Sequence, residues 1–122
     1  SLIALEQNLI ELRTLYKKDI MIAETAYPFT LGWNDWTNNI VGLEEQLILP
    51  EYPATPQGQK QFVQELKTII STLDGGMGLA YWGADLIAWN GPESAQGSSW
   101  ENQALFDFNN QALPALDEFE NP

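Results

Sequence analysis

Hydrophobic residues recur every three or four positions near the start of the chain. Leu2, Leu5, Leu9, Leu12 and Tyr16 follow this spacing, which is typical of one face of an amphipathic helix. Basic residues stand at positions 13, 17 and 18, where a positive charge favours the carboxyl end of a helix. The pattern therefore predicts a helix that ends at about residue 18.

The next hydrophobic run is short and has strand character. We expect a strand over residues 19–24, which ends in the carboxylate of Glu24. Residues 25–54 then contain prolines and glycines but little periodicity, and loops of this length in a compact domain are usually functional or disordered. Their many aromatic residues favour a packed, ordered loop.

A second helix and a second strand follow this loop. Thr55-Pro56 is a typical helix start, with a hydroxyl at the cap and proline in the first position. An apolar face then runs from Phe62 to Leu73, and a strand is expected over residues 78–82. A strand, a helical crossover and another strand form a βαβ unit, which predicts a parallel pair.

The remaining chain predicts a loop over residues 83–99 and a closing helix over residues 111–119. Two parallel strands would leave both edges of the sheet unpaired. We therefore interpret residues 1–122 as a single partial domain of α/β class, at the carboxyl end of a larger (β/α) fold. The chain begins inside a helical pattern, so we expect it to be part of a longer protein.

The amino-acid composition excludes several classes of partner and of catalytic mechanism. Seventeen acidic against five basic residues give a net charge of -12, which argues against partners such as nucleic acid or an anionic membrane surface. The chain has no cysteine and no histidine, which excludes disulfides, a cysteine nucleophile, a Ser-His-Asp triad and imidazole metal sites. Acid–base catalysis would have to come from carboxylates or tyrosines.

Glu24 is the principal candidate for such chemistry. The carboxyl end of a parallel strand is where α/β barrels place catalytic groups, and glycoside hydrolysis requires two carboxylates. The alternative is a glutamate that only caps a helix or forms an ion pair. Five tryptophans in or beside the loops add a second signal, because flat aromatic faces suit sugar rings, although each could simply be packed: Trp33, Trp36, Trp82, Trp89 and Trp100.

Oxygen-bearing side chains gather in the first long loop. Asp35, Asn38 and Asn39 are of the type that calcium prefers, but a calcium ion takes six to eight oxygen ligands and the cluster is sparse. A solvated turn explains these residues as well. We expect no cofactor, and Asp35 and Asn38 are the weak candidates for calcium ligands.

Four motifs, taken in order, resemble the carboxyl-terminal part of glycoside hydrolase family 53, the arabinogalactan endo-β-1,4-galactanases. They are Glu-Thr-Ala-Tyr-Pro at 24–28, Tyr-Pro-Ala-Thr-Pro-Gln-Gly-Gln at 52–59, Tyr-Trp at 81–82 and the run from Gly97 to Phe108. The resemblance covers nearly the whole chain. It implies a (β/α)8 TIM barrel in which residues 19–24 are strand seven and residues 78–82 are strand eight.

The resemblance also implies roles for individual residues. Glu24 matches the nucleophile of a retaining mechanism, and Trp82, Trp100 and Tyr27 match positions that bind the galactan substrate. The general acid of the family follows an asparagine, and no Asn-Glu pair exists in this chain. We therefore expect the 122-residue chain to be inactive alone, and to self-associate through its exposed sheet edges.

Two departures from the family pattern and two alternative functions remain. Tyr81-Trp82 is followed by Gly-Ala-Asp rather than Glu-Pro, and residues 33–39 keep only fragments of a calcium loop that some bacterial members carry. The resemblance implies a secreted, periplasmic or cell-surface parent, and no signal segment is recognisable in this chain. The alternative functions are a non-catalytic carbohydrate-binding module and an interaction domain.

Overall fold

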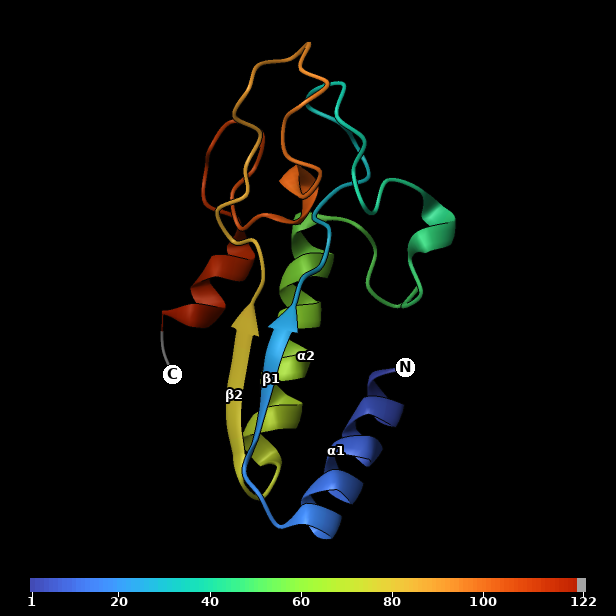
Figure 1. Ribbon diagram of the computed structural model, residues 1–122, viewed down its shortest axis with the longest axis vertical. Coiled ribbons are helices and arrows are strands. Elements are labelled where there is room, and N and C mark those ends of the chain that lie inside the picture. The colour runs from blue at the N-terminus through green and yellow to red at the C-terminus, as the bar shows by residue number, and fades with distance from the viewer. Residues whose placement is uncertain (121–122) are drawn as a thin grey trace.

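Two parallel strands form the centre of the structure, a computed structural model that describes residues 1–120 (Figure 1). Strand β1 (Ile20–Thr25) pairs with β2 (Gly76–Tyr81), and within residues 1–120 neither strand has a second neighbour. The predicted parallel pair is confirmed, and β2 begins two residues earlier than the hydrophobic pattern indicates. Both outer edges of this sheet expose backbone groups that can pair with other strands.

Helix α1 (Leu2–Tyr16) confirms the first predicted helix. The hydroxyl of Ser1 accepts a hydrogen bond from the backbone N–H of Ala4 at 3.4 Å, which caps the amino end. Lys17 takes a left-handed conformation with φ of 51°, and its N–H donates to the carbonyl of Arg13. That cap ends the helix at Tyr16, slightly before the expected boundary.

Helix α2 (Pro56–Thr72) carries the core of the molecule. The hydroxyl of Thr55 accepts from the backbone N–H of Gly58 at 3.0 Å, and Pro56 occupies the first position, as predicted. The buried apolar face packs beneath the sheet and consists of Phe62, Val63, Leu66, Ile69 and Ile70. Each of these side chains contributes about 2 kcal/mol of hydrophobic stabilisation, so α2 fixes the position of both strands.

The last predicted helix is partly wrong. Instead of an α-helix over residues 111–119, the structure has the 3₁₀ helix η3 (Pro114–Phe119), and Ala112 forms an antiparallel bridge with Phe106. Pro114 explains the difference, because the residue before a proline is pushed out of helical conformation. Leu113 accordingly has extended angles, with φ of −85° and ψ of 153°.

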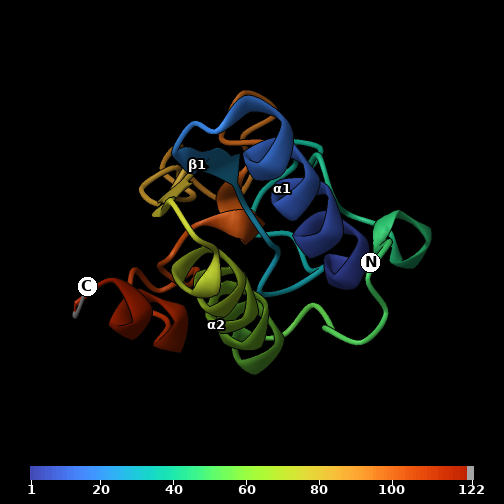
Figure 2. The same cartoon turned by 90° about the horizontal axis from the view of Figure 1, so that it is seen from below.

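Helix α2 lies between α1 and η3 on one side of the sheet, as the view from below shows (Figure 2). Two short 3₁₀ turns, η1 (Glu44–Gln46) and η2 (Glu101–Gln103), lie within the loops. None of the helices in the described part of the chain is long and apolar enough to cross a membrane. The resulting layer of helices leaves the other face of the sheet uncovered.

Candidate functional site

The long loops gather beyond the carboxyl ends of both strands (Figure 1). Backbone hydrogen bonds of 2.9 Å join the two loop segments, from Phe29 to Asn102, from Trp36 to Ser94 and from Ile40 to Ser99. Residues 25–54 are therefore packed against the segment after β2. This end of the sheet is where parallel α/β folds bind their ligands.

A β-bulge determines the direction of Glu24. Ile22 pairs with Leu79 and Thr25 pairs with Tyr81, so β1 has one more residue between these pairs than β2 has. With regular alternation, Glu24 would share the half-buried face of Ile22. Instead Ala23 and Glu24 are both exposed, and Thr25 is the residue that returns to the half-buried face. Bulges next to functional sites commonly redirect a side chain in this way.

The carboxylate of Glu24 makes no hydrogen bond or ion pair within residues 1–120. It does not cap a helix or pair with a cation there, as the purely structural interpretation of this glutamate would require. Its backbone neighbours are nevertheless held firmly by the sheet. A carboxylate on a rigid strand end with unused oxygens is suited to react with a ligand or to bind it.

Trp82 directly follows the last residue of β2, and Glu24 is the penultimate residue of β1. Its backbone N–H donates to the carbonyl of Thr25 at 2.7 Å, which places it beside the end of the neighbouring strand. The side chain of Trp82 is 45% exposed. Its ring meets that of Trp100 edge to face, with centroids 6.1 Å apart and an interplanar angle of 73°. The structure thus brings together two of the three side chains predicted to bind substrate.

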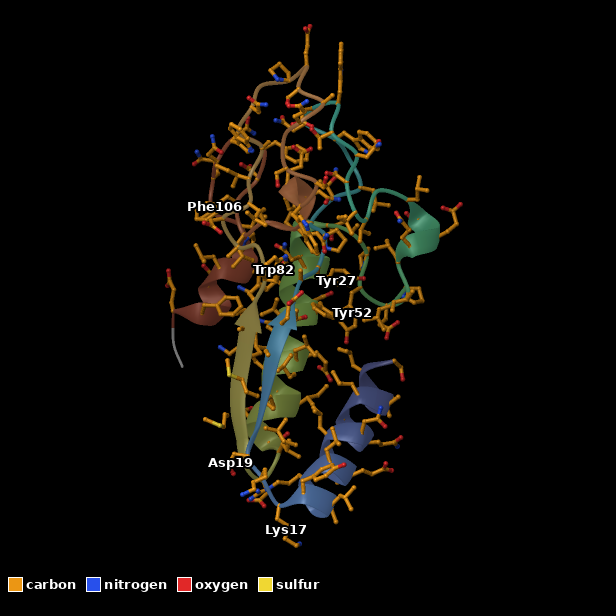
Figure 3. All side chains as sticks on the ribbon, viewed as in Figure 1. Lys17, Asp19, Tyr27, Tyr52, Trp82 and Phe106 are labelled. Atoms are coloured by element: carbon orange, nitrogen blue, oxygen red, sulfur yellow. The ribbon has the colours of Figure 1, made fainter. Side chains whose placement is uncertain are left out.

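Tyr27 is the third side chain predicted to bind substrate, and it lies beneath the loops (Figure 3). Its side chain is buried and stacks on Phe62 with a centroid distance of 4.4 Å. Its hydroxyl lies within hydrogen-bonding distance of the carbonyl oxygens of Tyr52 (2.6 Å) and Leu49 (3.2 Å). In this chain Tyr27 supports the loop over residues 49–52 rather than presenting its ring to solvent.

Gln59 connects three segments from the first turn of α2. Its fully buried amide donates to the carbonyls of Tyr27 at 2.9 Å and Ala104 at 3.0 Å, and lies 3.2 Å from the hydroxyl of Tyr81. Burial raises the pKa of Tyr81 to about 12, so this hydroxyl stays protonated at neutral pH. It lies 2.8 Å from the carbonyl oxygen of Gln103 and 3.1 Å from that of Tyr27. The network fixes both loops to the scaffold.

A buried acid lies next to Trp100. Glu101 is fully buried, and its Oε1 accepts from the backbone N–H of Asn34 at 2.8 Å. Burial raises the pKa of this carboxyl, and the negative charge of Asp35 raises it further. The neighbouring Asn102 donates to the carbonyls of Thr30 (2.8 Å) and Val41 (2.6 Å). Glu101 and Asn102 therefore hold the segment that carries Trp100 against the first loop.

The calcium candidates are placed in different surroundings. Asp35 is buried, and its Oδ1 accepts from the backbone N–H of Thr37 at 2.7 Å, whereas Asn38 is exposed. Gly97 closes the space beside Asp35 Oδ2, because a methyl group added at Gly97 would collide with that oxygen. Within residues 1–120 no group of three or more acidic residues could hold a metal ion. Asp35 Oδ2 has no hydrogen-bond partner within residues 1–120, and the assignment of Asp35 and Asn38 as calcium ligands stays a prediction.

Sequence reasoning did not identify Gln59 or Glu101 as site-forming residues. Gln59 could have been found, because it is a polar residue on the apolar face that Phe62 and Val63 continue. Glu101 lies in a short polar run without periodicity, so no pattern marks it as buried. The structure adds both residues as supports of the predicted site.

The chain is similar to known proteins over nearly its whole length. The family model for glycosyl hydrolase family 53 matches residues 1–119. An arabinogalactan endo-beta-1,4-galactanase from Cellvibrio japonicus is 40% identical over 122 residues, which cover 95% of this chain and 31% of that protein. An endo-beta-1,4-galactanase from Bacillus subtilis is 29% identical, over 86% of this chain and 32% of its own length.

Solved structures give the same family. The catalytic domain of a family 53 protein from Ignisphaera aggregans superimposes with a TM-score of 0.83 at 39% identity, over 94% of this chain and 33% of that one. A structure described as one of two fungal beta-1,4-galactanases gives a TM-score of 0.63 at 26% identity. The match covers 100% of this chain and 33% of that one. The chain thus spans about a third of the length of the relatives that it matches.

Proposed function

Because this chain belongs to glycosyl hydrolase family 53, we propose that the full-length protein containing it hydrolyses internal β-1,4 linkages of galactan or arabinogalactan. The observation that carries the proposal is the bulge that leaves Glu24 exposed at a strand end, beside the end of the strand that leads to Trp82. We assign β1 and β2 to strands seven and eight of a (β/α)8 barrel. The match to a third of two family 53 structures supports this assignment.

The mechanism that we propose is retaining and uses two carboxyl groups. Glu24 attacks the anomeric carbon of a galactose unit and forms a galactosyl ester, while a general acid protonates the departing oxygen. A water molecule then hydrolyses the ester with the second carboxylate as base. In such sites the two carboxyl groups stand about 5 to 5.5 Å apart. Only the nucleophile is assigned to this chain, so we expect the 122-residue chain to hydrolyse no galactan by itself.

The two tryptophans supply the sugar contacts in this proposal. Trp82 and Trp100 form a corner of two flat, apolar faces, and aromatic faces pack well against the C–H faces of pyranose rings. Glu101 and Asn102 hold Trp100 in place without touching the sugar. We also place the parent enzyme outside the cytoplasm, because a polysaccharide does not cross a membrane unaided.

Replacement of Glu24 in the full-length protein tests the assignment. Glu24→Gln is expected to lower galactan hydrolysis on the order of 10³-fold or more, since no nucleophile remains. Azide is expected to restore turnover in Glu24→Ala, because this small anion can attack the anomeric carbon in place of the carboxylate. Glu93→Gln, at an exposed acid in the second loop, is the matched control and should stay active.

Two outcomes would contradict the proposal. An active Glu24→Gln protein would exclude Glu24 as nucleophile. Galactan binding that survives Glu24→Gln but disappears in Trp82→Ala, together with no hydrolysis by the wild type, would instead favour a non-catalytic carbohydrate-binding module. If the wild-type protein binds no β-linked glycan at all, the chain is an interaction domain.

A further inference from the structure

The loop after β2 contains an asparagine followed directly by a glycine, Asn90-Gly91. Both residues are exposed, and neither belongs to a helix or a strand. We propose that Asn90 is a site of spontaneous chemical modification, at which its side-chain amide is lost and the contact between the two long loops is loosened. Such a modification would occur whether or not the protein hydrolyses galactan.

The reaction needs only the chain itself and water. The backbone nitrogen of Gly91, once it has lost its proton, attacks the side-chain carbonyl carbon (Cγ) of Asn90, to which the chain already holds it close. The Cγ–Nδ2 bond breaks, Nδ2 takes up a proton and leaves as ammonia, and a five-membered cyclic imide remains. Water then opens the imide. Cleavage of the new Cγ–N bond gives aspartate, and cleavage of the original peptide bond gives isoaspartate, so no oxidant or reductant is required.

The surroundings of Gly91 leave the attacking nitrogen accessible. A methyl group added at Gly91 would find no other part of the protein within 4 Å, and φ is 85°, in the left-handed region that favours glycine. The N–H of Gly91 makes no hydrogen bond within residues 1–120, so no acceptor retains the proton that must leave. A depression of about 470 Å³, lined by residues 90–94, admits water. Space, an unbonded N–H and water therefore meet at one peptide bond.

Asp74-Gly75 is the only other place in the sequence where an aspartate or asparagine precedes a glycine. There Nη2 of Arg13 lies 3.2 Å from Oδ2 of Asp74, and the guanidinium carbon lies 2.7 Å from the position of a Cβ added at Gly75. An ionised and paired carboxylate resists attack by a nucleophile, and the guanidinium crowds the glycine. The structure therefore favours reaction at Asn90 over reaction at Asp74.

The amide of Asn90 belongs to a joint between the two long loops. Its Nδ2 donates to the hydroxyl of Ser94 at 2.8 Å and to the carbonyl of Gln96 at 3.4 Å. The carbonyl of Ser94 accepts in turn from the N–H of Trp36 at 2.9 Å and from the hydroxyl of Thr37 at 3.1 Å. A carboxylate can only accept, so the modified residue removes the donor and adds a negative charge. Isoaspartate also lengthens the main chain by one atom, which displaces Ser94 from the first loop.

Incubation of the full-length protein at neutral and at mildly alkaline pH, followed by digestion and mass spectrometry, tests the chemistry. Asn90 should be converted faster than the exposed asparagines that no glycine follows, which serve as internal controls: Asn8, Asn38 and Asn109. The rate should rise with pH, because the attacking nitrogen must lose its proton. In Gly91→Ala a Cβ crowds the approach to Cγ, and conversion should slow at least about tenfold, which corresponds to a barrier higher by about 1.4 kcal/mol.

Hydrogen exchange tests the loosening. The N–H of Trp36 should exchange faster in the incubated protein and in Asn90→Asp than in the fresh wild type. The N–H of Phe29 is the control, because it donates to Asn102, which other hydrogen bonds hold. If Asn90 keeps its amide as long as the internal controls do, the modification site is wrong. Unchanged exchange at Trp36 in the modified protein would overturn the proposed effect on the loops.

Discussion

The ring of Trp82 meets the ring of Trp100 edge to face, at a centroid distance of 6.1 Å. The two residues are contributed by a strand end and by a loop, and hydrogen bonds through Glu101 and Asn102 hold the second. An edge contact leaves flat surface on both rings. The proposed sugar site therefore depends on the angle between the rings as well as on their presence.

Trp82 is expected to contribute to binding more than to folding, because its side chain is 45% exposed. Trp82→Ala should weaken galactan affinity about tenfold, while Trp82→Phe should recover most of the loss, since a flat ring remains. Calorimetric titration of a galactan oligomer in the Glu24→Gln background measures both variants. Equal losses in the two variants would show that the ring face is not what the sugar contacts.

Gln59 should be among the residues most sensitive to substitution. In Gln59→Leu the carbonyl of Ala104 loses its donor and the carbonyl of Tyr27 loses one of two, in a fully buried place. The free energy of unfolding should fall by about 2 to 3 kcal/mol, the range for unsatisfied buried acceptors. Chemical denaturation measures the change, and Gln61→Leu, at an exposed position of the same helix, is the control. A loss below that of Gln61→Leu would contradict the role of Gln59.

Because the carboxyl of Glu101 is buried, we expect its contribution to the stability of the folded state to decrease as the pH rises. Its pKa in the folded state lies above the ordinary 4.5, because burial and then the charge of Asp35 favour the protonated form. The folded state thus binds this proton more tightly than the unfolded state does, and the advantage disappears as the pH rises from 4.5 through the folded-state pKa. Unfolding midpoints over this range should fall less steeply in Glu101→Gln.

Glu93→Gln is the control for that pH series, because Glu93 is exposed. It should retain the wild-type slope. If Glu101→Gln also retains it, burial of the carboxyl does not determine the pH dependence.

The isolated chain should self-associate. Both strands have a free edge within residues 1–120, and the side chains of Met21 and Met77 are 53% and 71% exposed on the sheet. Leu15 of α1 is 72% exposed as well. Sedimentation at micromolar concentration should give a species larger than 13.7 kDa, and Met77→Lys should shift it toward the monomer. A wild-type monomer at these concentrations would contradict the expectation.

Local patterns were sufficient for the regular elements and insufficient for the site. The apolar spacing of α1 and α2 and the Thr55-Pro56 start depend only on nearby residues, so the sequence predicts them well. The bulge at Ala23 and Glu24 depends on how β1 pairs with a strand more than fifty residues later. No local pattern reports that pairing, although the hydrophobic run places Glu24 within one residue of the strand end.

The prediction of a closing α-helix is partly wrong for a related reason. Hydrophobic spacing over residues 111–119 predicts an α-helix, whereas in the structure Pro114 and the bridge between Phe106 and Ala112 decide the conformation. Burial of Glu101 is likewise a tertiary property. The Glu101 carboxylate accepts a hydrogen bond from the backbone N–H of Asn34, and the local sequence at residues 100–103 does not indicate this contact.

The contacts of Gln59 have a consequence for the order of folding. This amide reaches Tyr27, 32 positions earlier, and Ala104, 45 positions later, so two long chain closures must be complete before it can bind both. The βαβ scaffold requires one long closure, of β1 onto β2 more than fifty positions later, whereas Gln59 requires two further closures beyond it. The βαβ scaffold is therefore expected to assemble first and the sugar-binding end last. Mild heating should loosen that end first, with ligand binding lost before the helical signal declines.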